Sequence, residues 1–169
     1  MLHNPLITTE RTYMSTPDKL KLQQIRKLDS DPEIMRYITN GKPRTKTESE
    51  AWIAERRAEY IKYGFGLMPA YLKENDQFIG WAGLKKLENT GKIEVGYRLD
   101  KPYWGQGFAT EMTKGVIAYA NALLHIKQLV AVTDLGNEAS KNVLIKCGFE
   151  YVSKAFYYNT DVEYFELYF

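Results

Sequence analysis

A glycine-rich segment at residues 102–110 has the clearest chemical pattern in this sequence. It reads Pro-Tyr-Trp-Gly-Gln-Gly-Phe-Ala-Thr, and a helical spacing of apolar residues follows from Thr110 to Leu124. Small residues at positions 105, 107 and 109 let the backbone approach a ligand, and a helix start offers unpaired N–H groups and partial positive charge. This combination favours phosphate binding. On the glycines alone, the alternative is a tight strand-to-helix turn without a ligand.

The segment does not match two other kinds of phosphate loop. A nucleoside-triphosphatase loop needs Lys-Ser or Lys-Thr after its last glycine, whereas Ala109 and Thr110 stand in this stretch. A dinucleotide-binding loop needs a third Gly or Ala at position 110 and usually lies in the first strand–helix unit of a parallel sheet. The sequence therefore favours neither.

The same residues resemble the pyrophosphate loop of the Gcn5-related N-acetyltransferases (GNAT), which reads Arg/Gln-x-x-Gly-x-Gly/Ala. Gly107 and Ala109 match its last two fixed positions, and Trp104 replaces the basic or amide residue at the first. The stretch from Glu94 to Glu111 is similar to the RimJ/RimL-like branch of that family, which acetylates the N-termini of ribosomal proteins.

Other segments carry the same resemblance along nearly the whole chain. Asn-Glu-Ala-Ser at residues 137–140 and Lys-Cys-Gly-Phe at 146–149 are similar to a motif pair that follows strand five in this branch. Residues 31–37 and 51–53 look like its N-terminal helices. The resemblance implies the GNAT acyl-CoA N-acyltransferase fold, an α/β fold with a largely antiparallel sheet of about seven strands, splayed between strands four and five, and about four flanking helices.

Acetyl-CoA is the cosubstrate that the resemblance implies, with no metal required. Pantetheine would pair like an added strand with the backbone at residues 97–99, and a backbone N–H near Leu99 would stabilise the oxyanion. The pyrophosphate would lie at the helix start, and Asn137 would either contact pantetheine or cap its own helix. The implied cofactor-binding residues are Tyr97, Arg98, Leu99, Trp104, Gly105, Gln106, Gly107, Phe108, Ala109, Thr110, Asn137 and Asn142.

The implied reaction is direct attack of a primary amine on the thioester in a ternary complex. The amine must lose a proton, and Glu94 is the candidate base, acting directly or through water; its alternative role is a surface acid balancing Arg98. Many relatives protonate the leaving thiolate with a tyrosine at a position that is Leu144 here. Ser140 is the candidate in its place, with a simple hydrogen bond in the first helical turn as its alternative role.

The order of predicted elements fits one mixed sheet flanked by helices, and we expect residues 1–169 to form a single domain. Pro17, the Asp31-Pro32 pair and a capping box at Thr47 and Glu50 predict helix starts, and Asn40-Gly41 with Pro43 predicts the end of the short helix over 34–38. The expected strands are 6–14, 65–73, 77–85, 93–99, 128–133 and a hairpin over 151–168; the expected helices are 17–28, 34–38, 47–64, 110–124 and 138–146.

Composition narrows the class of protein further. A net charge of +2, with basic residues spread along the chain, gives no sign of a nucleic-acid partner. Cys147 is the lone cysteine and is expected to be a small buried filler, while His3 and His125 give no zinc pattern. No apolar run reaches the roughly 18 residues of a membrane span, and the start lacks a signal-peptide pattern. We expect a cytoplasmic protein, with homodimerisation expected only by analogy.

Two questions stay open at this level. The acceptor could be a protein N-terminal α-amine or a small-molecule amine such as a polyamine or an aminoglycoside, because the stretches at 37–47 and 157–161 spell no specificity code. The absent tyrosine at position 144 also leaves a different class open, a catalytically degenerate module that binds or senses CoA.

Overall fold

The computed structural model describes residues 4–38 and 41–169, so Asn40 of the expected helix end and the residue His3 lie outside the described part. In chain order the elements are β1 (Pro5–Thr8), β2 (Thr12–Ser15), the 3-10 helix η1 (Pro17–Lys19), α1 (Leu22–Asp29), α2 (Pro32–Met35), α3 (Lys46–Tyr63), β3 (Leu67–Leu72), β4 (Phe78–Lys86), β5 (Ile93–Leu99), the 3-10 helix η2 (Lys101–Tyr103), α4 (Phe108–Ala122), β6 (Gln128–Asp134), α5 (Glu138–Lys146), β7 (Glu150–Tyr157) and β8 (Thr160–Tyr168).

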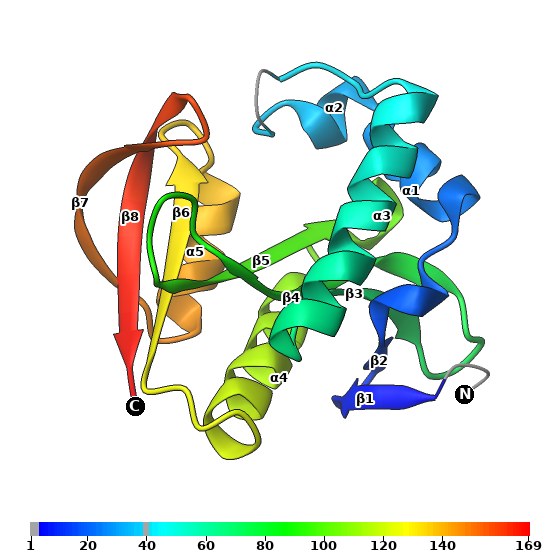
Figure 1. Ribbon diagram of the computed structural model, residues 1–169. Coiled ribbons are helices and arrows are strands. Elements are labelled where there is room, and N and C mark those ends of the chain that lie inside the picture. Colours follow the sequence, from blue (N-terminus) through cyan, green and yellow to red (C-terminus); the bar gives the residue numbers. More distant parts are fainter. Residues whose placement is uncertain (1–3, 39–40) are drawn as a thin grey trace.

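All strands belong to one mixed sheet with the order β1-β2-β3-β4-β5-β6-β8-β7. Every neighbouring pair is antiparallel except β5 and β6, which are parallel and paired only at Glu94 and Val130. In Figure 1, β6, β7 and β8 with α5 stand on one side of β5, and β1 to β4 with α1 to α3 stand on the other. The splay therefore falls, as expected, between the fourth and fifth predicted strands, residues 93–99 and 128–133, which are β5 and β6.

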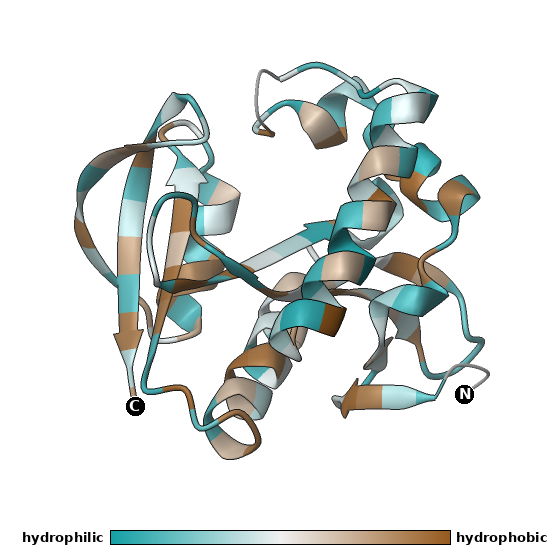
Figure 2. Ribbon diagram, viewed as in Figure 1, coloured by the Kyte–Doolittle hydropathy of each residue, from teal (hydrophilic) through white to brown (hydrophobic). Residues whose placement is uncertain are grey.

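Helices cover the two faces of the sheet differently. Helices α4 and α5 pack on one face over a large apolar core that includes Val95, Met112 and Phe165. Helices α1, α2 and α3 cover the other face of the first half of the sheet around Trp52 and Trp81. Beyond the splay, β8 places apolar residues on both faces, because Phe165 packs into the core under α4 and α5 and its neighbour Tyr164 packs with Leu87 and Val130 on the other face; hydrophobic and hydrophilic segments both occur along the strand (Figure 2).

Several predicted elements agree closely with the structure. Strand β5 and helix α5 have the predicted bounds, and α3 ends at Gly64, whose φ of 74° is the left-handed conformation of a helix C-cap. Asp31 caps α2 as expected, because its Oδ1 accepts hydrogen bonds from the backbone N–H groups of Glu33 at 2.8 Å and Ile34 at 3.3 Å.

Three local predictions were wrong. The stretch 6–14 forms a two-stranded hairpin, since Thr9 N donates to Thr12 O at 2.9 Å, and the described sheet therefore has eight strands instead of about seven. The predicted helix over 17–28 divides into η1 and α1. The capping box of α3 uses Thr45 and Glu48, two residues earlier than predicted, with each side chain bonded to the other residue's backbone N–H. Five α-helices result, one of them only a single turn.

Candidate active site

The splay leaves one edge of β5 without a strand partner. Asp100 N donates to Ile79 O at 2.9 Å, so the antiparallel ladder with β4 uses the backbone groups of alternate residues, including Arg98. The N–H and C=O groups of Tyr97 and Leu99 consequently point toward β6, which has already diverged beyond the pairing at Glu94. This edge can pair with an extended ligand in the manner of an added strand.

Trp104 forms a hydrogen bond with one of these backbone edge groups. Its indole Nε1 donates to Leu99 O at 3.0 Å. The tryptophan that replaces the basic residue of the family loop thus ties η2 to the end of β5. The N–H of Leu99 and both backbone groups of Tyr97 are the remaining edge groups.

The glycine-rich segment at residues 102–110 forms the expected loop and helix start. Gly105 and Gly107 have φ values of 72° and 82°, a conformation that favours glycine, and Gly107 is the N-cap of α4 without a capping side chain. The N–H groups at the start of α4 are therefore unoccupied by any side-chain cap. Gly105, Gly107, Phe108, Ala109 and Thr110 line a cleft of about 990 Å³ that also contains the β5 edge.

Arg11, in the β1–β2 hairpin, braces this loop from outside the cleft. Its Nη1 donates to Gln106 O at 3.0 Å, its Nε donates to Glu111 at 2.7 Å, and its guanidinium lies 4.1 Å from the centre of the Phe108 ring. Glu111 also accepts hydrogen bonds from Thr9 and from Arg11 N. Sequence reasoning missed Arg11, although the lack of a cation at position 104 was a signal to look for one elsewhere.

Ser140 lies in the first turn of α5, facing the splay. Its backbone N–H donates to Asn137 Oδ1 at 3.1 Å, so Asn137 is a helix cap, and its Oγ lies 2.9 Å from Tyr97 Oη. Burial raises the pKa of Tyr97 to about 12, with the hydrogen bond to Ser140 opposing that shift. Tyr97 is therefore protonated at neutral pH, and its hydroxyl holds Ser140 at the edge where a ligand would pair.

Glu94 lies at the other end of the same cleft and is almost completely buried, with 4% exposure. Tyr158, in the β7–β8 turn, donates its hydroxyl to Glu94 Oε2, and Lys85 Nζ lies 3.5 Å from the same oxygen. Burial raises the pKa of Glu94 above its usual value, as does the charge of Glu88, while Lys85 and Tyr158 oppose the shift. A carboxylate whose pKa lies closer to neutrality is suited to general base catalysis.

The alternative role of Glu94 as a surface acid was wrong. Arg98 instead donates to Asp29 Oδ1 at 2.7 Å in a fully buried contact with α1, and Asp29 also binds Arg44 and Ser49. Burial lowers the pKa of Arg98 to about 9, so it stays charged at neutral pH. Since its charge faces α1 and its backbone faces β4, Arg98 is placed to hold the sheet and α1 together, and not to pair with a cofactor.

Glu94 and Ser140 reach the cleft from opposite faces of the sheet. Glu94 faces the side of α3 and the β7–β8 turn, whereas Tyr97, which contacts Ser140, packs with the core under α4 and α5. The cleft passes between them. Of the predicted site residues, Gln106 and Asn142 do not line the cleft; Gln106 turns its amide to Pro102 O at 2.6 Å, and Asn142 is exposed on α5.

The cleft wall around Glu94 carries charges of both signs. Acidic and basic side chains come from α2 and the segment after it, from the middle and second half of α3, from β4 and from the following loop, and they are Glu33, Arg36, Arg44, Glu55, Arg56, Glu59, Lys85, Lys86 and Glu88. Arg56 is 7% exposed and pairs with Glu55 at 2.7 Å. Thr133, on β6, is buried at the cleft with no hydrogen-bond partner for its hydroxyl within the described residues.

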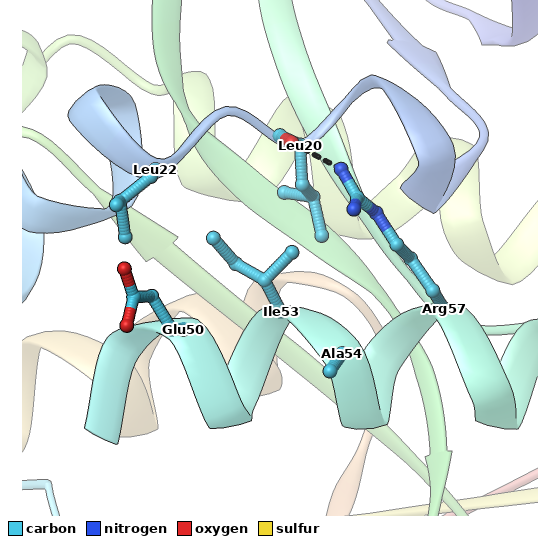
Figure 3. Close-up of a pocket in the computed structure, with 6 residues that line it drawn as sticks. All are labelled: Leu20, Leu22, Glu50, Ile53, Ala54 and Arg57. Carbon is cyan, nitrogen blue, oxygen red and sulfur yellow. Dashed lines mark hydrogen bonds between the residues drawn. The ribbon is translucent and has the colours of Figure 1, made fainter. Parts of the chain in front are cut away.

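A second, smaller hollow of about 190 Å³ lies between α3 and the segment before α1 (Figure 3). Arg57 points across it and donates to Leu20 O at 2.8 Å. Leu22, Ile53 and Ala54 supply most of the remaining lining. Because its guanidinium is bonded to the main chain, Arg57 fastens α3 to this segment, and we place the chemistry in the large cleft.

Comparisons with known proteins identify the family. A family-wide sequence model described as an acetyltransferase (GNAT) domain matches residues 11–150. This match covers most of the chain, and the chain therefore belongs to the GNAT acetyltransferases.

Over residues 4–38 and 41–169, the structure contains no helix that could cross a membrane.

Individual relatives agree with this assignment. An FsC-acetyl coenzyme A-N(2)-transacetylase from Aspergillus fumigatus is 30% identical over 141 residues, which is 77% of this chain; the chain spans 58% of the length of that relative. A spermidine N-acetyltransferase from Vibrio cholerae, solved with CoA and spermine, has a TM-score of 0.76, 16% identity, and coverage of 94% of this chain and 95% of its own. RimL, a ribosomal L7/L12 α-N-protein acetyltransferase solved with CoA, has a TM-score of 0.78, 12% identity, and coverage of 98% of both chains. The two solved structures establish the GNAT fold.

Proposed function

We propose that this protein is an N-acetyltransferase that transfers the acetyl group of acetyl-CoA to a primary amine by direct attack in a ternary complex. One observation carries the proposal: the unpaired edge of β5 lies beside a phosphate-binding helix start within a single cleft of about 990 Å³. Pantetheine and pyrophosphate are joined in CoA, and these two features would bind them in that order. No metal is required for this reaction.

Each step of the reaction has a candidate group in the cleft. The N–H of Tyr97 or Leu99 would donate to the thioester oxygen and stabilise the tetrahedral oxyanion. The amine nitrogen would bond to the acetyl carbon, with Glu94 as the final acceptor of its proton. The C–S bond would then break, and Ser140, hydrogen-bonded to Tyr97, would protonate the thiolate on the other face. Amine and thiol would thus use opposite faces of the sheet.

The cleft wall around Glu94 carries charges of both signs, and this supports an α-amine over a polyamine as the acceptor. A polycation would be repelled by the basic members of that wall, whereas the α-amine of a peptide or of an amino-acid-derived molecule presents one cation beside polar or anionic groups. The N(2) position named for the Aspergillus relative agrees with an amine of this kind. An α-amine, with a pKa near 8, also requires less help to lose its proton than a lysine amine. A RimJ/RimL-like protein acceptor belongs to the same class.

The leucine at position 144 supports one competing function, a CoA-binding module without transferase activity. Calorimetric titration with acetyl-CoA, followed by a free-thiol release assay, distinguishes the two. The acceptor panel would pair peptides bearing a free α-amine with the same peptides blocked at that amine, and would include spermidine. We expect saturable binding and thiol release only with free α-amines. Binding without release from any amine would favour the module, and an absence of binding would contradict both functions.

A further inference from the structure

Tyr158 is fixed over Glu94 by three separate contacts. Its hydroxyl donates to Glu94 Oε2, its backbone N–H donates to the carboxylate of Glu88, and Lys85 Nζ lies 4.0 Å from the centre of its ring. Its backbone has a φ of 54°, which is rare for a bulky residue, and Asn159 follows at 59°. The β7–β8 turn thus adopts an unfavourable backbone conformation while directing one hydroxyl at the buried carboxylate.

Glu94 lies too far along β5 to contact an amine that attacks the thioester. Tyr97, the nearer of the two proposed oxyanion donors, comes three residues later in β5, and three residues of strand span about 10 Å. On the face that bears Glu94, the next residue along the strand is Gly96, which has no side chain and lines the cleft. The amine can therefore approach over Gly96, but a further group must span the remaining distance to the carboxylate.

We propose that Tyr158 is a catalytic residue that passes the proton of the acceptor amine to Glu94. This inference rests on the proposed acetyltransferase function. As the amine nitrogen bonds to the acetyl carbon, its N–H proton moves to Tyr158 Oη, and the hydroxyl proton of Tyr158 moves to Glu94 Oε2. The C–S bond breaks, the sulfur keeps its electron pair, and it takes a proton at Ser140. Exchange with solvent returns Glu94 and Ser140 to their starting states, so the amide and the free thiol are the only net products.

The surroundings of Glu94 suit this relay. Tyr158 and Glu94 line the same cleft, and the charged groups facing them are Lys85 from β4 and Glu88 from the loop after it. Burial and the nearby carboxylates raise the pKa of Tyr158, so it stays protonated until its proton is handed on. A concerted transfer requires no free tyrosinate.

A double-mutant cycle of Tyr158→Phe and Glu94→Gln tests the relay. With the acceptor that gives the fastest thiol release, we expect Tyr158→Phe to lower kcat about 100-fold, as loss of general base catalysis does, with unchanged affinity for acetyl-CoA. In the Glu94→Gln background the same change should cost less than about twofold, because the two groups act as one unit. Tyr157→Phe is the matched control, an adjacent tyrosine that does not line the cleft, and should retain the wild-type rate.

The possible results separate the relay from the transferase function. Equal losses from Tyr158→Phe in both backgrounds, or a wild-type rate in the single variant, would overturn the relay while the transferase function stands. A wild-type protein that binds acetyl-CoA but releases no thiol with any amine would overturn both.

Discussion

Glu94 and Tyr97 are three residues apart in β5, and their side chains leave the strand on opposite faces because the side-chain period of a strand is two. Glu94 therefore meets Tyr158 and Lys85 on one face, while Tyr97 meets Ser140 on the other. The odd spacing of Glu94 and Tyr97 thus places the candidate base, Glu94, and the candidate acid, Ser140, on opposite faces of β5. The thioester would lie between them along the free edge of β5.

Glu94→Gln tests the base through its pH profile. Burial raises the pKa of Glu94, so in the wild-type protein the plot of kcat/KM against pH should fall on the acid side at a pH above the usual carboxyl range of about 4. The sign follows from the role: a base is active when ionised, and activity falls as the pH drops through its pKa. The variant should lose about 100-fold in rate at neutral pH and lack this carboxyl limb, keeping only the fall caused by protonation of the acceptor amine, whose pKa lies near 8. Glu150→Gln, at an exposed carboxylate of β7, is the control, and a limb that persists in Glu94→Gln would exclude Glu94 as its source.

Ser140→Ala tests the proton donor on the other face. The hydroxyl of Ser140 is hydrogen-bonded to Tyr97 Oη, and the helix cap uses the backbone N–H of Ser140, which the variant keeps. We expect kcat to fall about 10-fold or more, with the calorimetric affinity for acetyl-CoA unchanged. Ser153→Ala, at an exposed position of β7, should match the wild type. Equal losses in affinity and rate would assign Ser140 a binding role instead.

At the scale of elements, the β1–β2 hairpin acts on a loop about 95 residues later in the chain. Arg11 bonds to Gln106 O and to Glu111, and so connects the hairpin to both the loop and the first turn of α4. Gly105 and Gly107 adopt the positive φ values that this loop requires, but ordering a glycine costs more conformational entropy than ordering any other residue. The loop therefore has little stability of its own. If the loop binds the cofactor as proposed, the hairpin would contribute to that binding without touching the cofactor.

Arg11→Ala should weaken acetyl-CoA binding about tenfold. A hydrogen bond that involves a charged group contributes about 1.5–3 kcal/mol, and about 1.4 kcal/mol corresponds to a tenfold change in affinity. The matched control is Arg57→Ala, because Arg57 also donates to main-chain carbonyls but borders the small hollow by α3. Calorimetry of both variants is the measurement. If Arg57→Ala weakens binding as much as Arg11→Ala, the effect is one of general stability and not of the loop.

Local signals predicted the elements and part of the site, and they failed where distant segments meet. The loop at residues 102–110, α5 and β5 follow from short patterns of glycine, capping residues and alternation, which act within a few residues. Arg11 and Tyr158 reach the site through contacts across 95 and 64 residues, for which one sequence has no local signal. The Thr45 capping box was assigned two residues late because Thr47 and Glu50 fit the same pattern. Only the direction from which the preceding chain enters the helix distinguishes the Thr45 capping box from the Thr47 one.

At the scale of the whole molecule, the splay divides the sheet into two parts. Strands β1 to β5 and β6 to β8 are joined by one pairing at Glu94 and Val130 and by the packing of α4 and α5 beneath them. A ligand along the free edge of β5 would fill the missing pairings and contact α5 at the same time. Binding should therefore stabilise the fold as a whole, beyond ordering the loop.

Acetyl-CoA at about 100 times its Kd should raise the melting temperature by about 5–10 °C. A ligand at that concentration adds about 2.7 kcal/mol to the free energy of unfolding, and a chain of this length gains about 2–4 °C per kcal/mol. Gly107→Glu should show almost no shift, because the φ of 82° at that position strains any side chain and the new group enters the phosphate loop. Gly91→Glu, in the β4–β5 loop where a Cβ meets nothing within 4 Å, should shift like the wild type. Differential scanning calorimetry of the three proteins is the measurement, and an equal shift in Gly107→Glu would mean that acetyl-CoA binds elsewhere on the molecule.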